Sequence, residues 1–214
     1  MRIAIIGRTE ILFDTVLEVI DKGHEVPLII TAKEAQEYTK TSNDFKQLAS
    51  NIGAKFMHAP KLNSPEVIDL VKSCGEMDIA LSFNYSSIID DEIIRLFHLG
   101  ILNAHGGDLP RYRGNACQAW AIINGENRIG LCIHSMVGGE MDSGDIIDRD
   151  YLAIDHNTKV GAVWEWKRKK IPSMFVNSAE QLYTSPNYCI EKQSTNPYDA
   201  LRCYPRLPID GRID

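Results

Sequence analysis

The first 105 residues alternate between short apolar runs and amphipathic segments, and this pattern restricts the fold more than any other feature of the chain. The apolar runs have the length of buried strands, and the segments between them place apolar residues at helical spacing. Such alternation predicts βαβ units, and hence a mostly parallel, Rossmann-like α/β sheet with helices on both faces. The strands are expected at residues 2–7, 24–31, 54–60, 77–84 and 100–105, and the helices at about 9–23, 42–52, 64–75 and 90–100.

Local signals mark the ends of these helices. Ser64 is a candidate N-cap, and Pro65 follows it at the first helical position. Gly23 and Gly100 stand where two of the helices should stop. Capping residues and periodicity therefore agree on the same elements.

Beyond residue 105 the pattern becomes less regular. A helix is expected at 115–126, strands at 129–137 and 146–154, and a loop between them. Residues 158–183 read as a pair of helices that Pro172 interrupts. The last stretch, rich in Pro and Arg, reads as a short tail or hairpin. We expect a catalytic domain over 1–184 and a C-terminal extension over 185–214 that is a candidate dimer contact.

Composition excludes several classes of function. The net charge of −6 argues against a nucleic-acid partner, and five scattered cysteines without a CxxC pair argue against a metal site. The N-terminus lacks the features of a signal peptide, and no window has the ~20 apolar residues of a membrane span, so a cytoplasmic protein is expected. The basic run 167–170 could contact nucleic acid or membrane, but a solvated helix end is the favoured interpretation.

Polar residues at the predicted strand ends carry the candidate chemistry. Ligands of parallel sheets bind outside the carboxyl ends of the strands, where Asn103 and His105 stand, and Asp142 lies in a later Gly-rich loop. An Asn amide can donate to a developing oxyanion, a His can accept a proton, and an Asp can orient the imidazole. No Ser, Cys or Thr is an evident nucleophile, so the pattern favours an external nucleophile that attacks a bound carbonyl.

A second candidate is the turn "GRTE" at residues 7–10. It matches neither a dinucleotide-binding fingerprint nor a P-loop. It is either a tight strand-to-helix turn or a turn at which Arg8, Thr9 and the backbone N–H groups meet an anion.

The segment "LNAHGGDLPRYRGNACQAWAIINGE", followed by "GEMDSGDII", resembles the N10-formyltetrahydrofolate-dependent formyltransferase family. That family carries Asn-x-His, Leu-Pro-x-Tyr/Trp-Arg-Gly, a Trp-Ala-Ile-like helix that ends in Gly-Glu, and Asp-x-Gly, in this order. The resemblance covers about residues 1–155 and includes "SFNYSSIID". One departure is "HGGDLP", because many members read His-x-Ser-Leu-Leu-Pro.

The resemblance implies roles for these residues. Asn103 would hold the formyl carbonyl and the oxyanion, His105 would be the general base or polarise the carbonyl as its cation, and Asp142 would orient His105. No metal is implied. N10-formyltetrahydrofolate would be the co-substrate, and its pterin would be bound by Tyr85, Ser87, Ile88, Ile89, Gly139, Glu140 and Met141.

The acceptor follows less directly from the resemblance. Transfer-RNA members carry a further basic domain, purine-pathway members have a Gly-Ser-rich first loop, and deformylases have a preceding regulatory domain. A nucleotide-linked amino sugar, used for surface polysaccharide (O-antigen) synthesis, is therefore the expected acceptor. The segments "HGGDLPRYRGNA" and "RCYPRLPIDGRID" resemble members that act on 4-amino-4-deoxy sugars, which implies a 4-amino group on this sugar. A methionyl-tRNA formyltransferase, another folate-dependent transferase or hydrolase, and a non-enzymatic nucleotide-binding module are the alternatives. The residues expected at the acceptor are Arg8, Thr9, Gly107, Asp108, Arg111 and Arg113.

Overall fold

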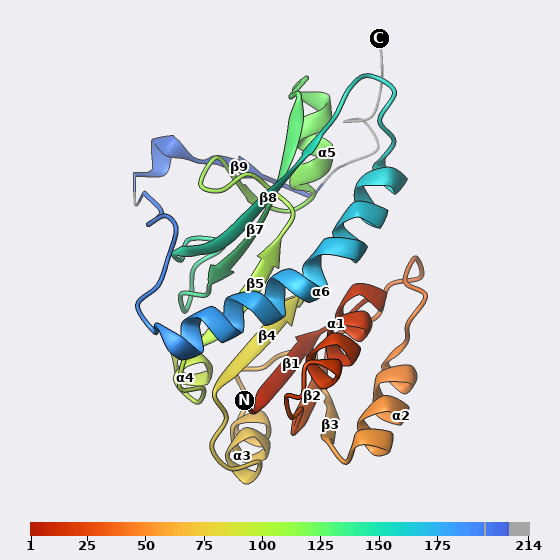
Figure 1. The fold of residues 1–214 in the computed structure, drawn as a ribbon, viewed down its shortest axis with the longest axis vertical. Coiled ribbons are helices and arrows are strands. Elements are labelled where there is room, and N and C mark those ends of the chain that lie inside the picture. Colours follow the sequence, from red (N-terminus) through yellow and green to blue (C-terminus); the bar gives the residue numbers. More distant parts are fainter. Residues whose placement is uncertain (195, 206–214) are drawn as a thin grey trace.

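A seven-stranded mixed sheet with helices on both faces forms the body of the protein in our computed structural model, which describes residues 1–194 and 196–205 (Figure 1). The strand order is β3-β2-β1-β4-β5-β7-β8, and the first five strands of this series are parallel. The alternation in the sequence therefore predicted the fold class correctly. The parallel strands are β1 (Ile3–Gly7), β2 (Leu28–Thr31), β3 (Lys55–His58), β4 (Ile79–Phe83) and β5 (Ile101–His105).

The two remaining strands of the sheet run antiparallel. β7 (Arg128–Ser135) pairs with β5, and β8 (Ile146–Ala153) pairs with β7 at the edge. Because β7 lies antiparallel to β5, the loop that follows β7 does not leave from the sheet edge where β5 ends. The register nevertheless places His134 of β7 opposite Asn103 of β5.

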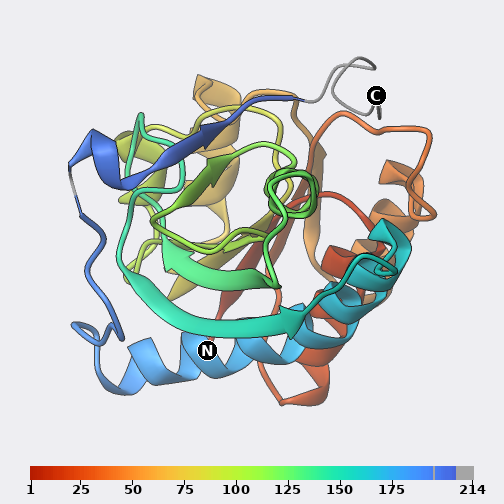
Figure 2. The ribbon, with the colours of Figure 1, turned by 90° about the horizontal axis from the view of Figure 1, so that it is seen from above.

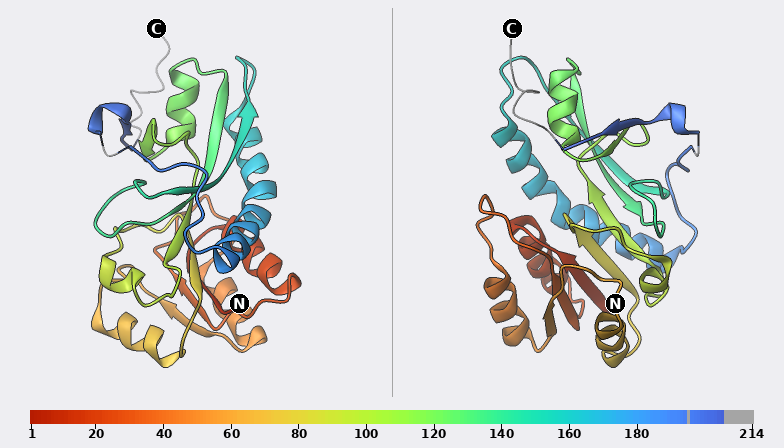
Figure 3. Two further views of the ribbon diagram at one scale, coloured as in Figure 1. Left: turned by 60° about the vertical axis from the view of Figure 1, so that its left-hand side comes forward. Right: turned by 180° about the vertical axis from the view of Figure 1, so that it is seen from behind.

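Helices cover the two faces of the sheet and create two separate hydrophobic cores. Figure 1 shows α1 (Glu10–Asp21), α2 (Ser42–Ile52) and α6 (Val160–Thr184) over one face. The view from behind in Figure 3 shows α3 (Pro65–Ser73) and α4 (Asp91–Ile94) over the other. Alternate strand residues supply the cores, as Ile3 and Ile5 face the first and Ala4 and Ile6 face the second.

Two predicted helix ends are confirmed, and the end predicted at Gly100 is wrong because α4 ends at Ile94. The Ser64 side chain accepts a hydrogen bond from the backbone N–H of Val67, and Pro65 is the first residue of α3. Gly23 adopts a positive φ of 79° just after α1, which a glycine does without steric cost.

The predicted helix pair over 158–183 is wrong, because α6 is one helix of 25 residues with Pro172 inside it. A proline inside a helix costs about 3 kcal/mol through a lost hydrogen bond and a steric clash. Ile171, Met174 and Phe175 are buried against the sheet around this position, and their packing outweighs that cost. The basic run 167–170 consequently lies in the middle of a helix, and not at a solvated end.

The chain after α6 returns around the edge strand β8 to the far side of the sheet (Figure 2). Ile146 in β8 forms an isolated bridge with Glu191, and β9 (Leu201–Cys203) pairs in parallel with β6 (Tyr112–Gly114). The tail therefore joins β6, close to α5 (Cys117–Ile123), in place of forming a hairpin of its own. A single 3-10 turn, Pro197–Asp199, precedes β9. The part of the extension over 206–214 lies outside the described residues.

None of the described helices is long and apolar enough to cross a membrane.

Candidate active site

Asn103, His105 and Asp142 come together in a cleft of about 410 Å³ at the end of β5. Asn103 and His105 belong to the strand itself, and Asp142 comes from the loop between β7 and β8. This cleft also reaches the ends of β1 and β4, as expected for a ligand site at the carboxyl edge of a parallel sheet. The three residues singled out in the sequence thus share one site.

His105 is held by hydrogen bonding on one side and by charge on the other. Its Nε2 lies 2.7 Å from the carbonyl oxygen of Tyr112, and a carbonyl can only accept, so Nε2 carries the proton. Its Nδ1 lies 3.4 Å from Asp142 Oδ2. Burial lowers the pKa of His105 although the Asp142 carboxylate acts in the opposite direction. At neutral pH His105 is therefore a neutral imidazole whose basic atom is Nδ1.

Asp142 remains ionised although it is nearly buried. Burial favours its neutral form, but the positive charges of the protonated forms of His105 and His134, together with the backbone N–H of Gly114, hold the pKa of Asp142 below the usual range. The Gly114 N–H donates to Asp142 Oδ2 at 2.9 Å. The backbone of Asp142 has a positive φ of 52°, a region that non-glycine residues seldom occupy and that here aims the carboxylate at His105.

The amide of Asn103 is oriented by His134. His134 Nδ1 donates to the carbonyl of Ser135 at 2.8 Å, which leaves the lone pair of the neutral ring on Nε2. Asn103 Nδ2 donates one hydrogen to this Nε2 at 3.1 Å, and His134 Nε2 also lies 3.5 Å from Asp142 Oδ1. The second amide hydrogen of Asn103 is left to donate to a ligand in the cleft.

Gln193 of the C-terminal extension supports the Asp142 loop from behind. Its side-chain nitrogen donates to the backbone carbonyls of Asp142 and Gly144 at 3.0 and 2.6 Å. Its side-chain oxygen accepts two hydrogen bonds from the guanidinium of Arg113. Arg113, expected at the acceptor, is thus placed to brace the extension, and it does not line the cleft.

The residues expected at the pterin line one wall of the same cleft. Tyr85, Ser87, Ile88, Ile89, Glu140 and Met141 all do so. Gly139 stands behind them, and its N–H donates to the carbonyl of Ile89 and joins the two segments. The Tyr85 hydroxyl donates to the carbonyl of Ala59 at 2.5 Å, and burial raises the pKa of Tyr85 to about 12. Tyr85 therefore lines the cleft as an uncharged aromatic side chain.

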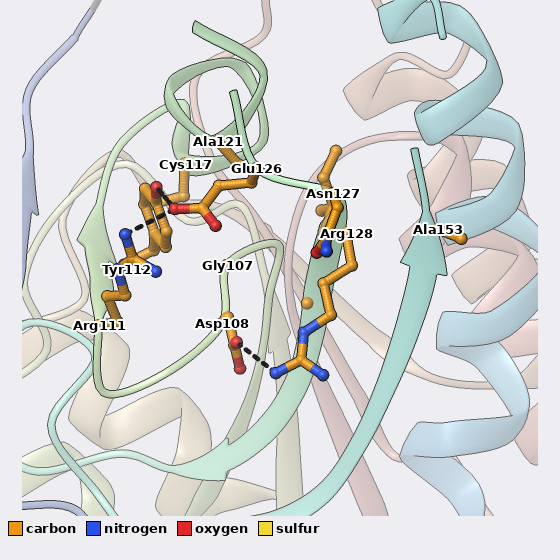
Figure 4. A pocket seen from close by; sticks show the side chains of 12 residues that line it. Gly107, Asp108, Arg111, Tyr112, Cys117, Ala121, Glu126, Asn127, Arg128 and Ala153 are labelled. Atoms are coloured by element: carbon orange, nitrogen blue, oxygen red, sulfur yellow. Dashed lines mark hydrogen bonds and ion pairs between the residues drawn. The ribbon is translucent and has the colours of Figure 1, made fainter. Parts of the chain in front are cut away.

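The residues expected at the acceptor do not lie in one site, and some of them line the catalytic cleft while others line a second cavity. Arg8 lines the catalytic cleft, where its guanidinium donates to the carbonyls of Asn84 and Lys33. Thr9 is fully buried and does not line it. Gly107, Asp108 and Arg111 line a second cavity of about 510 Å³ on the other side of the loop that follows His105 (Figure 4). Their binding roles remain predictions.

Glycine at position 107 leaves room for the contact between His105 and Tyr112. A Cβ added there would lie 2.5 Å from His105 Nε2 and 2.6 Å from the Tyr112 carbonyl oxygen. The departure from the serine of many family members thus allows the hydrogen bond that fixes the His105 tautomer.

Two further residues that line the cleft, Ser82 and Lys167, and His134, which contacts Asn103 from beside the cleft, were not expected from the sequence. His134 and Ser82 sit in apolar strands, and Lys167 was assigned to a solvated helix end. Lys167 is only 4% exposed and lines the cleft, so that assignment is wrong for this residue. Ser82 pairs in register with Asn103, and its buried hydroxyl has no hydrogen-bond partner within the described ranges. For Ser82 and His134, a polar residue inside an apolar strand was the sequence signal that could have indicated a place at the site.

Over residues 1–194 and 196–205 no group of three or more His, Cys, Asp or Glu side chains is arranged to hold a metal ion.

Comparison with known proteins identifies the family from the sequence and the fold from solved structures. A sequence model described as formyl transferase matches residues 1–178. WlaRD, a sugar 3N-formyl transferase whose structure was determined in the presence of dTDP and 5-N-formyl-THF, aligns with a TM-score of 0.69 and 19% identity over 94% of this chain and 69% of its own.

Two other solved structures show the same fold. An N-formyltransferase from Helicobacter canadensis, in complex with folinic acid and dTDP-3-aminofucose, aligns with a TM-score of 0.69 and 18% identity over 94% of this chain and 71% of its own. Glycinamide ribonucleotide transformylase 1 from Symbiobacterium toebii aligns with a TM-score of 0.72 and 17% identity over 90% of this chain and 92% of its own. With the family match spanning most of its length, the chain belongs to the formyl transferase family.

Proposed function

We propose that this enzyme moves a formyl group from N10-formyltetrahydrofolate to the amine of a nucleotide-linked amino sugar, a 4-amino-4-deoxy sugar. The observation that carries the proposal is the cleft in which Asn103, a neutral His105 and an ionised Asp142 converge. Solved sugar formyltransferases with dTDP or a dTDP-amino sugar share the fold and support a nucleotide-linked amino sugar as the acceptor. The 4-amino position rests on the sequence resemblance, since these two enzymes are described with 3-amino sugars.

The wall between Tyr85 and Met141 fits the flat, hydrogen-bonding head of the folate. Ile88 and Met141 are exposed large apolar side chains at this wall, and the Ser87 hydroxyl is buried without a partner in the described structure. Apolar surface with a few convergent polar groups is typical of a site for an aromatic ligand. A Tyr85 without charge is compatible with a neutral ring system.

The protein groups can perform the transfer as acid–base and electrostatic catalysts. The amine nitrogen forms a bond to the formyl carbon, and the free N–H of Asn103 donates to the formyl oxygen as negative charge develops there. His105 Nδ1 accepts the proton that the amine loses, and the Asp142 carboxylate stabilises the imidazolium. As the bond from the formyl carbon to N10 breaks, the imidazolium returns this proton to the leaving nitrogen.

A glycinamide ribonucleotide acceptor is less compatible with the first loop. In purine-pathway relatives, by resemblance, the ribose phosphate meets the turn after the first strand. Here the buried Glu10 carboxylate stands in the first turn of α1, where it accepts a hydrogen bond from Trp164 Nε1 at 2.7 Å. This carboxylate already occupies the helix end that would favour an anion, and it would repel a phosphate.

The proposal is tested by incubating the protein with N10-formyltetrahydrofolate and a panel of UDP-, dTDP- and GDP-linked amino sugars. We expect a mass gain of one formyl group on at least one 4-amino sugar, with stoichiometric tetrahydrofolate. Formylation of glycinamide ribonucleotide alone, or release of formate without an acceptor, would assign the enzyme to another class of the family. The Asn103→Ala variant should fold and fail to form the product.

A further inference from the structure

Lys167, in the middle of α6, is buried in the wall of the catalytic cleft. Its Nζ lies 3.2 Å from the point that a Cβ on Gly106 would occupy, and Gln118 Oε1 lies 3.3 Å from the same point. Gly106 directly follows His105 in the chain. An ammonium group and an amide thus stand over the backbone beside the general base, and a glycine leaves the space for them.

The charge of Lys167 has no counter-ion within the part of the chain that the structure describes. No carboxylate oxygen lies within 4.0 Å of its Nζ there, and its close charged or aromatic contact is the Trp164 ring at 4.8 Å. Two neighbouring cations of the same helix are paired. Arg168 meets Asp14 and Lys170 meets Asp150, each at 2.8 Å.

A buried cation without a counter-ion destabilises a fold, and such residues are rarely found away from functional sites. Burial lowers the pKa of Lys167 to about 8, so most molecules still carry the charge at neutral pH. The aromatic ring compensates for part of the lost hydration. An anionic ligand that enters the cleft would supply the missing counter-charge.

The position of Lys167 indicates which of the two substrates it meets. The wall expected to hold the pterin belongs to the face of α3 and α4, since Tyr85 and Met136 pack against that core. Trp164, one turn before Lys167, packs against the core under α1 and α6. Asn103 and His105 lie between the two walls. Because donor and acceptor must approach the formyl carbon from different sides, Lys167 belongs to the acceptor side.

We propose that Lys167 forms an anion subsite on the acceptor side of the cleft and binds a phosphoryl oxygen of the acceptor's nucleoside diphosphate. The inference rests on the proposed function, which supplies the diphosphate. Arg8 also lines the cleft, but its guanidinium already donates to backbone carbonyls. The three N–H donors of Lys167 are uncommitted within the described chain, and the nearby Gln118 amide can adapt to the same ligand.

The test compares Lys167→Met with Lys170→Met, a matched loss of a paired lysine on the same helix. Binding of dTDP, UDP, GDP and inorganic pyrophosphate is measured by calorimetry, with folinic acid as the probe of the donor wall. We expect Lys167→Met to weaken the tightest nucleoside diphosphate by roughly 10- to 100-fold and to leave folinic acid unchanged. Lys170→Met should change neither affinity. Since Lys167→Met removes a buried charge, its melting temperature should equal or exceed that of the wild type.

Each alternative result has a defined meaning. Equal nucleoside diphosphate affinity in Lys167→Met and wild type would overturn the subsite, and so would the absence of both diphosphate and pyrophosphate binding by the wild type. Selective loss of folinic acid would overturn it too and assign Lys167 to the donor's carboxylates. Lys167-dependent pyrophosphate binding in a protein that formylates no nucleotide sugar would support the subsite and contradict the proposed function. Normal formylation by Lys167→Met would contradict the subsite alone.

Discussion

Two cavities lie on either side of the loop that follows His105, and they use their charged residues in opposite ways. In the second cavity every arginine faces an acid, because Arg111 pairs with Glu126 at 2.7 Å and Arg128 with Asp108 at 3.6 Å (Figure 4). In the catalytic cleft Lys167 forms no ion pair with a carboxylate of the described residues. The larger cavity is thus electrostatically satisfied, and the smaller one is prepared for an incoming anion.

The difference also extends to hydrogen bonding. In the second cavity the Tyr112 hydroxyl donates to Glu126 and accepts from Asn124, so the polar wall is already paired. In the cleft, Asn103 retains one free N–H, and the hydroxyls of Ser82 and Ser87 have no partner in the described structure. Unsatisfied polar groups, more than size or number of charges, distinguish the catalytic cleft from the second cavity.

The largest expected effect comes from His105→Ala. Without the group that accepts the amine's proton, turnover should fall on the order of 10³-fold, while the second cavity and the fold stay intact. Single-turnover formylation, together with a melting curve, measures both. A variant that retains more than a tenth of wild-type turnover would show that His105 is not the base.

The next largest effect concerns the pH profile of Asp142→Asn. The base works only when neutral, and burial lowers its pKa, so wild-type kcat/KM should fall with acid below about pH 6.5. The Asp142 carboxylate raises the pKa of His105, so its removal should move this acid limb to lower pH. Turnover should also drop roughly 10²-fold, because the imidazolium loses its partner. A limb that moves to higher pH would contradict this role.

The sequence predicted the parallel sheet well, because strand and helix periodicity are local properties of each segment. It also located Asn103 and His105, since the end of β5 marks the ligand edge of the sheet. The helix break at Pro172 was predicted wrongly. Burial of its neighbours depends on packing against the sheet, which no local rule contains.

The rest of the site depends on contacts between distant segments. His134 serves Asn103 only because β7 pairs with β5 in one particular register. Lys167 reaches the cleft only because α6 crosses above β5. Conversely, Asp108 and Arg111 are close to His105 in the chain, yet the loop turns them into the other cavity. Proximity in sequence misleads where a loop reverses direction.

The wall between the cavities can be tested with Gly107→Ser, which introduces the residue of many family members. A Cβ at this position would collide with His105 Nε2 and with the Tyr112 carbonyl oxygen. The hydrogen bond that fixes the tautomer should be lost, and kcat should fall about tenfold or more with a smaller change in folate affinity. Wild-type kcat in this variant would show that the Tyr112 contact does not position the base.

The smallest effect is expected from Arg111→Met in the second cavity. Arg111 is largely exposed, its pair with Glu126 is of the type that contributes at most about 1 kcal/mol, and it does not line the cleft. Turnover and nucleoside diphosphate affinity should therefore stay within about twofold of the wild type. Glu126 would still accept from the Tyr112 hydroxyl, so the cavity should not collapse. A loss of nucleoside diphosphate affinity comparable to that expected for Lys167→Met would place the anion site in the second cavity. The distinction between the two cavities would then be reversed, because the diphosphate would have to displace Glu126 from Arg111.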